Sequence, residues 1–311
     1  MILIKDIKLE KAKTPNDIIK QMYDSGGFSA KKIAVGVDIL ELMMKDKGCT
    51  KILSMPGAPI STGMRGVILL LVKNKLIDAI ITTCGFLDHD FARIWKPYMH
   101  GDFMMDDAAL HKKGVFRLGN ILIPKSSYGE ILEDKLQPIL QKLWAKGRQE
   151  LASYEIIAEM GKSLENEKNK NDSIIYGAYK NNIPIFVPGL TDGAVGNQIW
   201  LFSQKKKFRI NTLEDENKLA SMMFDAKKLG ALSIGGGISK HHAIWWAQFR
   251  GGLDYMVYIT TAVEYDGSLS GAQTREAISW GKLKEKAKHI TIEGDATALL
   301  PLMIAALIER L

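Results

Sequence analysis

A lysine near the C-terminal end of the sequence stands among residues that could make it chemically reactive. Lys282 lies two residues after Trp280 and six residues after Glu276, and a Gly/Ser-rich segment, residues 266–271, comes before them. A lysine attacks carbon electrophiles only as the neutral amine, and apolar surroundings favour that form. Trp280 and Ile278 would help to supply such surroundings, and Glu276 could hold a cationic substrate. One interpretation is therefore that Lys282 is a covalent nucleophile.

The alternative interpretation of the same residues is structural. Residues 279–282, SWGK, can be the C-terminal end of a short helix, with Gly281 as its cap. Lys282 would then be a solvated charge near the negative end of the helix dipole. Taken without its context, the segment favours this second interpretation, so the rest of the chain has to decide between the two.

Composition excludes several classes of protein. The chain has 311 residues, of which 46% are hydrophobic and 25% charged, enough for one large α/β domain or two small ones. No apolar run reaches the roughly 18 residues that a membrane span needs, so no membrane is expected as a partner. Residues 1–13 alternate charged with apolar side chains, unlike a signal peptide. Two cysteines, Cys49 and Cys84, in no metal-ligand spacing fit a reducing cytoplasm.

The net charge of +7 makes nucleic acid a partner to consider. The lysines are interspersed with glutamates, however, as in residues 162–170, KSLENEKNK. They do not gather into one basic stripe with aromatic residues. We therefore expect no nucleic acid as a partner.

Buried strands, small-residue loops and helices alternate along much of the chain, which predicts a parallel sheet covered by helices. The run at 77–81 is continuous and β-branched, as in a strand buried on both faces. Further strands are expected at 52–55, 119–124, 183–187, 231–234, 255–259 and 289–292. Helices are expected after caps at Thr14 and Asp295, from Ser29 up to Gly48, and at 62–72, 128–144, 149–161, 173–180 and 239–250.

Residues 162–172 are expected to form an exposed loop and not a domain boundary, because the alternation resumes after them. The sequence shows no internal repeat. It predicts one α/β domain over residues 1–311, doubly wound and Rossmann-like, with a mainly parallel sheet and helices on both faces.

Several predicted strands end in small or acidic residues, at 82–85, 191–193, 235–237, 260–262 and 295–296. In an open parallel sheet, ligands bind beyond the carboxyl ends of the strands. Glycines there let phosphates approach backbone amides at helix N-termini. No segment has the GxGxxG spacing, and each glycine cluster taken alone can be a tight turn, so the local pattern leaves a dinucleotide site open.

Taken together, these segments resemble the deoxyhypusine synthase family over nearly the whole chain, in order and in spacing. The matching segments are ISTGMR (60–65), TTCG (82–85), PGLTDG (188–193), GGGISKHH (235–242), DY (254–255), DGS (266–268), SGA (270–272), EAISWGK (276–282) and DA (295–296).

The resemblance implies an NAD-dependent transferase with the deoxyhypusine synthase fold. Its reaction would move the aminobutyl group of spermidine, through an imine on an enzyme lysine, to a lysine of the hypusine-bearing translation initiation factor. It also implies a homotetramer in the cytoplasm, with sites between paired subunits.

By position, the resemblance makes Lys282 the imine-forming lysine and His241 the active-site histidine, suited to proton transfer near neutral pH. The substrate-binding residues that it implies are Glu276, Trp280, Asn197, His89, Tyr258 and Ser270. The NAD-binding residues that it implies are Ser61, Thr83, Cys84, Gly85, Asp192, Gly236, Gly237, Thr261, Ala262, Asp266, Asp295 and Ala296.

Three positions depart from the best-known members of the family. His89 stands in for a carboxylate, Asn197 occupies an aspartate position, and Leu269 replaces the aspartate between Ser268 and Ser270. Two of these changes remove a formal charge where a protonated amine should be held. Nearby acids, Asp88, Asp90 or Glu264, could substitute, or the donor could carry fewer charges at that end.

The departures keep two other functions open. One is a related enzyme with another amine donor or acceptor, such as putrescine in a homospermidine-synthase-like reaction. The other is an NAD-binding protein without transferase activity, which would have no need of a desolvated lysine. No metal site is expected, because Asp88, His89, Asp90, His100 and Asp102 fit no ligand spacing.

Overall fold

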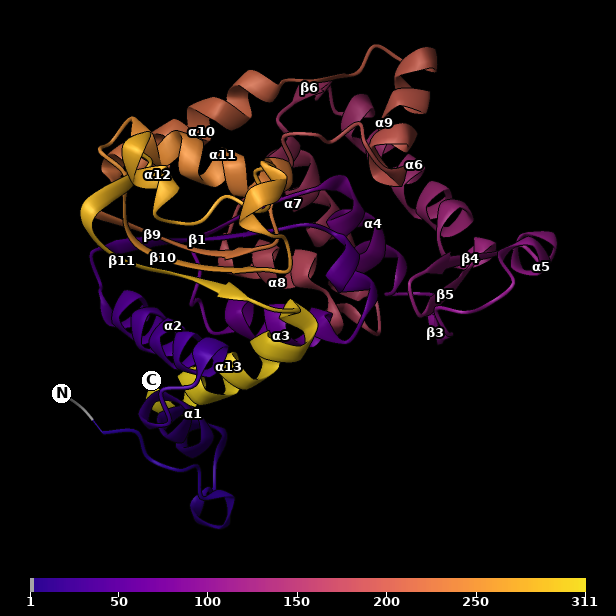
Figure 1. The fold of residues 1–311 in the computed structure, drawn as a ribbon. Helices are drawn as coiled ribbons and strands as arrows, with labels where there is room; N and C mark the ends of the chain where they lie inside the picture. Colours follow the sequence, from indigo (N-terminus) through magenta and orange to yellow (C-terminus); the bar gives the residue numbers. More distant parts are fainter. Residues whose placement is uncertain (1–2) are drawn as a thin grey trace. The chain divides into compact units, whose positions relative to one another are not determined.

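The structure is a computed structural model that describes residues 3–311 (Figure 1). Its main sheet has six strands in the order β11-β10-β9-β1-β2-β7, flanked by helices, which confirms the predicted α/β class. The pairs β1–β9, β9–β10 and β10–β11 are parallel. The strands are β1 (Cys49–Met55), β2 (Ala79–Thr82), β7 (Ile185–Phe186), β9 (Lys228–Ile234), β10 (Leu253–Thr260) and β11 (Leu283–Glu293).

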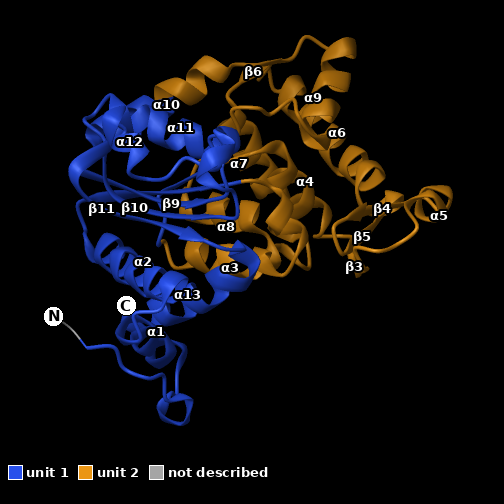
Figure 2. Ribbon diagram, in the orientation of Figure 1, with its two compact units in different colours: residues 1–55, 76–81, 218–311 blue, residues 56–75, 82–217 orange. Residues whose placement is uncertain are grey.

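The chain divides into two compact units, each built from separate stretches of sequence (Figure 2). Unit 1 comprises Met1–Met55, Leu76–Ile81 and Lys218–Leu311, and unit 2 comprises Pro56–Lys75 and Thr82–Asn217. The single domain over residues 1–311 stays a prediction.

Unit 1 holds the strands that carry the candidate lysine. Helices α2 and α13 cover one face of these strands and α11 covers the other (Figure 1). The packing is close, since a Cβ added at Gly36 of α2 would lie 2.6 Å from the side chain of Ile292 on β11. The helices of this unit are α1 (Pro15–Asp24), α2 (Phe28–Lys45), α11 (Gly237–Gln248), α12 (Glu276–Ser279) and α13 (Ala296–Arg310).

Unit 2 is mainly helical. Its helices are α3 (Met64–Lys73), α4 (Cys84–Ala92), α5 (Asp107–Lys112), α6 (Gly129–Ala145), α7 (Ser153–Ser163), α8 (Ile174–Asn181) and α9 (Ala194–Lys205). A small antiparallel sheet has the order β3-β5-β4, with β3 (Met99–His100), β4 (Val115–Leu118) and β5 (Ile121–Pro124), and β6 (Glu150–Leu151) pairs with β8 (Arg209–Ile210). Helix α10 (Thr212–Asp225) begins in unit 2 and ends in unit 1.

The predicted caps are confirmed. Thr14 and Asp17 form a reciprocal capping box at α1, and Asp295 accepts from the Thr297 amide at the start of α13. The predicted helix at 149–161 begins later, at Ser153, because residues 150–151 form β6 and the amides of Ser153 and Tyr154 donate to Asp215. The predicted loop at 162–172 contains two single 3₁₀ turns.

Strand β11 is longer than predicted, starting at Leu283 where the prediction starts at His289. It is an edge strand of the sheet. Its first part carries four charged side chains within residues 284–288, and charge is common on edge strands because it discourages pairing with other chains. That pattern hides the strand from a search for continuous apolar runs.

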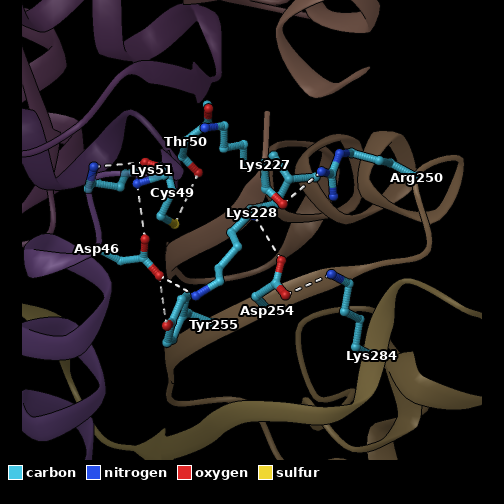
Figure 3. A network of polar contacts seen from close by, with 12 residues as sticks. Asp46, Cys49, Thr50, Lys51, Lys227, Lys228, Arg250, Asp254, Tyr255 and Lys284 are labelled. Carbon is cyan, nitrogen blue, oxygen red and sulfur yellow. Dashed lines mark hydrogen bonds and ion pairs between the residues drawn. The ribbon is translucent and has the colours of Figure 1, made fainter. Parts of the chain in front are cut away.

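Ion pairs and hydrogen bonds hold the amino ends of the unit 1 strands together (Figure 3). Asp254 accepts from the Leu229 amide at 3.0 Å and from Lys284 Nζ at 2.7 Å, and so joins β9, β10 and β11. Asp46 accepts from Lys228 Nζ at 2.6 Å and from the Tyr255 hydroxyl at 3.1 Å. This end of the sheet is thereby fixed by charge, and the carboxyl ends of the same strands remain for a ligand.

We predict that Asp254→Ala lowers the free energy of unfolding by about 1–3 kcal/mol, because it leaves the amide of the buried Leu229 without its acceptor. Asp24→Ala is the matched control, since Asp24 pairs with Lys5 at the exposed surface and such pairs contribute at most about 1 kcal/mol. Urea denaturation of the two variants measures the difference. Equal losses would show that Asp254 has no special part in joining the strands.

Candidate active site

Lys282 lies at the turn that leads into β11. The preceding helix α12 ends at Trp280, and Gly281 has a φ of 67°, a left-handed conformation that favours glycine. The Lys282 amide donates to the Ala277 carbonyl at 3.0 Å, and its own carbonyl accepts from the Leu253 amide at 3.1 Å. The helix end and the glycine are as the structural interpretation predicts. The same interpretation also predicted that Lys282 is a solvated charge, and this part is wrong, because Lys282 is only 8% exposed.

Aromatic rings surround the Lys282 ammonium. Its Nζ lies 5.1 Å from the centre of the Trp280 ring and 5.7 Å from that of Trp245 on α11. Rings at this distance attract a cation and also keep water away from it. Trp280 itself is 65% exposed, so it forms an outer wall. Lys282 therefore sits in the apolar surroundings that imine chemistry needs.

His241 is the polar neighbour of this lysine. Its Nε2 lies 3.5 Å from Lys282 Nζ, at the outer limit of a hydrogen bond. Burial lowers the pKa of His241, and the positive charge of Lys282 lowers this pKa further. A neutral imidazole at this place can accept a proton from the lysine or from a bound amine.

A cavity of about 280 Å³ joins these residues. Glu276 is the only carboxylate among its lining residues in the described chain, and three basic side chains, Lys240, His241 and Lys282, line the same cavity. The remaining wall is Ile244, Trp245, Met256, Leu269, Ala272, Gln273, Thr274, Ala277 and Trp280. The cavity thus offers an apolar channel with one anionic group, which suits an alkyl chain with an ammonium end.

Tyr258 and Ser270 support the wall of the cavity and do not line it. Tyr258 is wholly buried in β10, and its hydroxyl donates to the Ser270 carbonyl at 2.6 Å. Thr260 Oγ1 donates to the same carbonyl at 3.0 Å. A direct substrate contact by Tyr258 or Ser270 stays a prediction.

The NAD-binding residues predicted in unit 1 lie just beyond the carboxyl ends of three adjacent strands. Gly236 and Gly237 follow β9, Thr261 and Ala262 follow β10, and Asp295 and Ala296 follow β11. Asp266 is in the 3₁₀ turn after β10, where it accepts from the Ser268 amide.

The glycine turn after β9 leaves its backbone open. Gly237 has a φ of 69° and no heavy atom within 4 Å of where a Cβ would stand. Gly236 is needed for packing, since its Cβ would lie 2.3 Å from Ser270 Cα. The turn leads directly into α11, which begins at Gly237. This arrangement fits the pyrophosphate of a dinucleotide.

The other predicted NAD-binding residues belong to unit 2. Thr83 caps α4 and accepts from the Gly57 amide at 2.9 Å, Gly85 packs against Gly57, and Ser61 donates to the Ala58 carbonyl. Asp192 is exposed before α9. Burial raises the pKa of the Cys84 thiol, so this cysteine is a packing residue and not a nucleophile.

Two acids that could have replaced the missing carboxylates are occupied inside unit 2. Asp88 is fully buried and accepts from the amides of Ala194 and Val195, at the start of α9, and from the Tyr128 hydroxyl. Asp90 is also fully buried, and its partners are Arg65, Ser173 and the first amides of α8. Glu264 is paired with Arg275 at the surface. The expectation that Asp88 or Asp90 replaces one of the missing carboxylates is therefore wrong.

The two departures in unit 2 differ in their surroundings. His89 is buried, and its Nδ1 lies 3.1 Å from the Tyr98 hydroxyl. Burial, followed by the charge of Arg93, lowers the pKa of His89 to about 4, so the ring is neutral at physiological pH. Asn197 is exposed on α9. Their predicted contacts with the amine stay predictions.

Trp245 is a site residue that the sequence analysis did not single out. It stacks at 5.6 Å on the His241 ring and continues to Phe249 at 5.5 Å. The spacing 241, 245, 249 is that of one helix face, so the sequence did contain the signal. Within residues 3–311, no group of His, Cys, Asp and Glu side chains is placed to hold a metal ion, and no helix is long and apolar enough to cross a membrane.

Comparison with known proteins agrees with the geometry. The deoxyhypusine synthase family model matches residues 17–307. The chain belongs to the deoxyhypusine synthase family. It is 53% identical to a probable deoxyhypusine synthase of Picrophilus torridus, with 98% of this chain and 97% of the relative covered. It is 50% identical to one of Thermoplasma acidophilum, with 97% and 96% covered.

A solved structure from Entamoeba histolytica, titled as a deoxyhypusine synthase, shares the fold. Its TM-score is 0.65 at 19% identity, over 98% of this chain and 97% of that one. Deoxyhypusine synthases are transferases, so the chain is a member of an enzyme family. Its relatives match over almost their full length, and the segments around Lys282 and His241 lie inside the matched region.

We predict that Lys282→Met raises the pKa of His241, because it removes the positive charge that lowers this pKa and leaves the effect of burial. Labelled imidazoles followed by NMR against pH give the value, and His241→Gln assigns the signal among the six histidines. Lys284→Met is the control, since it removes a lysine only two residues away whose ammonium pairs with Asp254 and not with His241. An unchanged pKa of His241 in Lys282→Met would show that the charge of Lys282 does not act on His241.

Proposed function

We propose that the protein transfers the aminobutyl group of spermidine, in an NAD-dependent reaction, to a lysine of the hypusine-bearing translation initiation factor. The observation that carries this proposal is the placement of Lys282, buried between Trp245 and Trp280 and 3.5 Å from His241. Family membership adds the substrates. The proposal includes a cytoplasmic homotetramer.

Five cavity residues have a part in this reaction. Glu276 holds the ammonium end of the butyl chain, and Trp280 and Trp245 pack on its methylenes. His241 takes a proton from Lys282, which frees the lone pair of the amine. Lys282 Nζ then bonds to the carbon of the oxidised donor, whose bond to the leaving three-carbon diamine breaks. The acceptor lysine next displaces Lys282 from the imine carbon, and reduction of the new imine completes the transfer.

The residues at the strand ends of unit 1 fit NAD. The open backbone at Gly237, at the start of α11, suits the pyrophosphate. Asp295 supplies a carboxylate just after β11. When bound, NAD supplies the hydride acceptor for oxidation of the donor and the hydride for the final reduction. Ser61, Thr83, Cys84, Gly85 and Asp192 remain proposed as NAD-binding residues on the resemblance to the family.

The test of the function is incubation with NAD, spermidine labelled in the butyl group, and a candidate initiation factor. Mass analysis should find one aminobutyl group on one lysine of the factor. If the factor stays unlabelled while the enzyme oxidises spermidine, the factor is not the acceptor of the aminobutyl group.

We predict that Lys282→Ala abolishes both the borohydride-trapped enzyme adduct and transfer to the factor, because no amine remains to hold the fragment. Lys282→Arg should be equally inactive, since a guanidinium stays protonated. Oxidation of spermidine, followed by the absorbance of reduced nicotinamide, can persist in both variants. Robust transfer by either variant would show that another residue is the nucleophile, and Lys240 would be the next candidate.

We predict that NAD raises the melting temperature of the protein, because a ligand at about 100 times its dissociation constant stabilises the folded state by roughly 2.7 kcal/mol. Gly237→Val should reduce the shift, since it closes open backbone at a left-handed position. Scanning fluorimetry at millimolar NAD measures both. An unchanged melting temperature of the unsubstituted protein would remove the cofactor from the proposal.

A related enzyme with a less charged donor is the second candidate, and one observation favours it. Glu276 is the only carboxylate that lines the described cavity, and Leu269 lines it where the best-known members have an aspartate. A donor such as putrescine needs fewer anionic partners than spermidine. Turnover of putrescine with spermidine inert would make this candidate the better one.

A further inference from the structure

Lys240 is a buried cation that the proposed reaction does not use. It is 2% exposed, lies on α11 next to His241, and also borders the cavity. Burial lowers the pKa of Lys240 to about 8, and the distant attraction of Glu276 only partly opposes this. A buried charge is costly unless hydrogen bonds satisfy it. The contacts of Lys240 show how that is achieved.

The partners of the Lys240 ammonium are two backbone carbonyls and an aromatic face. Its Nζ donates to the Leu269 carbonyl at 2.9 Å and to the Ala272 carbonyl at 2.7 Å. It also lies 3.7 Å from the centre of the Tyr258 ring, within the range of a cation–π contact. Both carbonyls belong to one short segment, residues 269–272, so a single side chain holds both ends of it.

This segment is a wall of the cavity. Leu269 and Ala272 line the cavity that also contains Lys282. Between them, the Ser270 carbonyl accepts from Tyr258 and Thr260. Three carbonyls of the segment are thus satisfied from inside the protein, which removes the need for water at this wall.

The sheet beneath supplies a second attachment. Ser54, Ser233, Tyr258 and Thr291 stand in register across β1, β9, β10 and β11. Of this polar row, Tyr258 holds the Ser270 carbonyl, and Thr291 Oγ1 accepts from the Thr274 amide at 3.0 Å. The row thus holds Ser270 in the middle of the wall and Thr274 two residues after it, while Lys240 of α11 holds Leu269 and Ala272.

We propose that Lys240 is a positioning residue, whose ammonium anchors residues 269–272 and thereby keeps the cavity shaped for the alkyl chain of the amine. It takes no part in bond formation. Its donors point to the wall and the Tyr258 ring, whereas Lys282 has the imidazole beside it. The amine part of this inference rests on the proposed function, and the anchoring part does not.

The test compares Lys240→Met, which removes charge and donors at similar length, with Lys240→Gln, which keeps two N–H donors. Lys51→Met is the matched control, because Lys51 is a half-buried lysine of unit 1 that donates to the Cys49 carbonyl at the other end of the sheet. Three quantities are measured: hydrogen exchange of residues 268–276, KM and kcat for spermidine, and the mass-mapped site of the borohydride-trapped adduct.

We expect Lys240→Met to speed exchange in residues 268–276 and to raise KM about tenfold or more, the effect of losing hydrogen bonds to a charged group. Lys240→Gln should fall between this variant and the unsubstituted protein, and Lys51→Met should match the latter. Because Lys282 remains, kcat should change less than KM and the adduct should still map to Lys282. If the methionine variant does not fold, the glutamine variant gives the same comparison.

Unchanged exchange in residues 268–276 of both Lys240 variants would overturn the anchoring. Faster exchange with unchanged KM would overturn the role in amine binding. Loss of the adduct with normal exchange would make Lys240 a catalytic residue. If the unsubstituted protein forms no adduct with spermidine, the proposed function fails, and the exchange comparison still decides whether Lys240 holds the wall.

Discussion

The site depends on keeping water out of a cavity whose wall is partly bare backbone. The cavity must exclude water around a reacting amine, yet a short loop without regular structure brings carbonyl groups that must be satisfied. The protein meets both needs from within. Tyr258 and Thr260 donate to the Ser270 carbonyl, and Lys240 donates to its neighbours. The rings of Trp245 and Trp280 can then surround Lys282.

The two ends of the unit 1 strands have different roles because parallel strands place all their carboxyl ends at one edge. At the amino ends, ion pairs such as Asp254–Lys284 and Asp46–Lys228 join neighbouring strands. At the carboxyl ends, the chain turns through glycines and short polar residues, and at Gly237 there is open space where a side chain would stand. The proposed NAD-binding residues thus lie at the edge opposite these ion pairs, whereas Lys282 lies beside Leu253 at the amino ends of β10 and β11.

Much of the fold could be predicted from sequence, since continuous apolar strands and capped helices leave strong local patterns. The cap at Thr14 and the buried strand at 77–81 are examples. Strand β11 was hidden by its alternating charges, and β6 and β8 are too short to leave a pattern. Lys282, His241, Glu276 and Trp280 could be predicted as a group because the family segments carry them together, and one cavity indeed contains all four.

What the sequence could not give were the partners of buried polar groups. Asp88 and Asp90 looked available for an amine because sequence shows charge and not burial, yet both are held by backbone amides and side chains inside unit 2. Lys240 looked like a second nucleophile for the same reason.

The most direct test of the account is a crystal structure of the borohydride-reduced adduct with NAD. We expect the butyl chain to extend from Lys282 Nζ between Trp245 and Trp280 towards Glu276, and a chain attached to Lys240, or lying outside this cavity, would contradict the account.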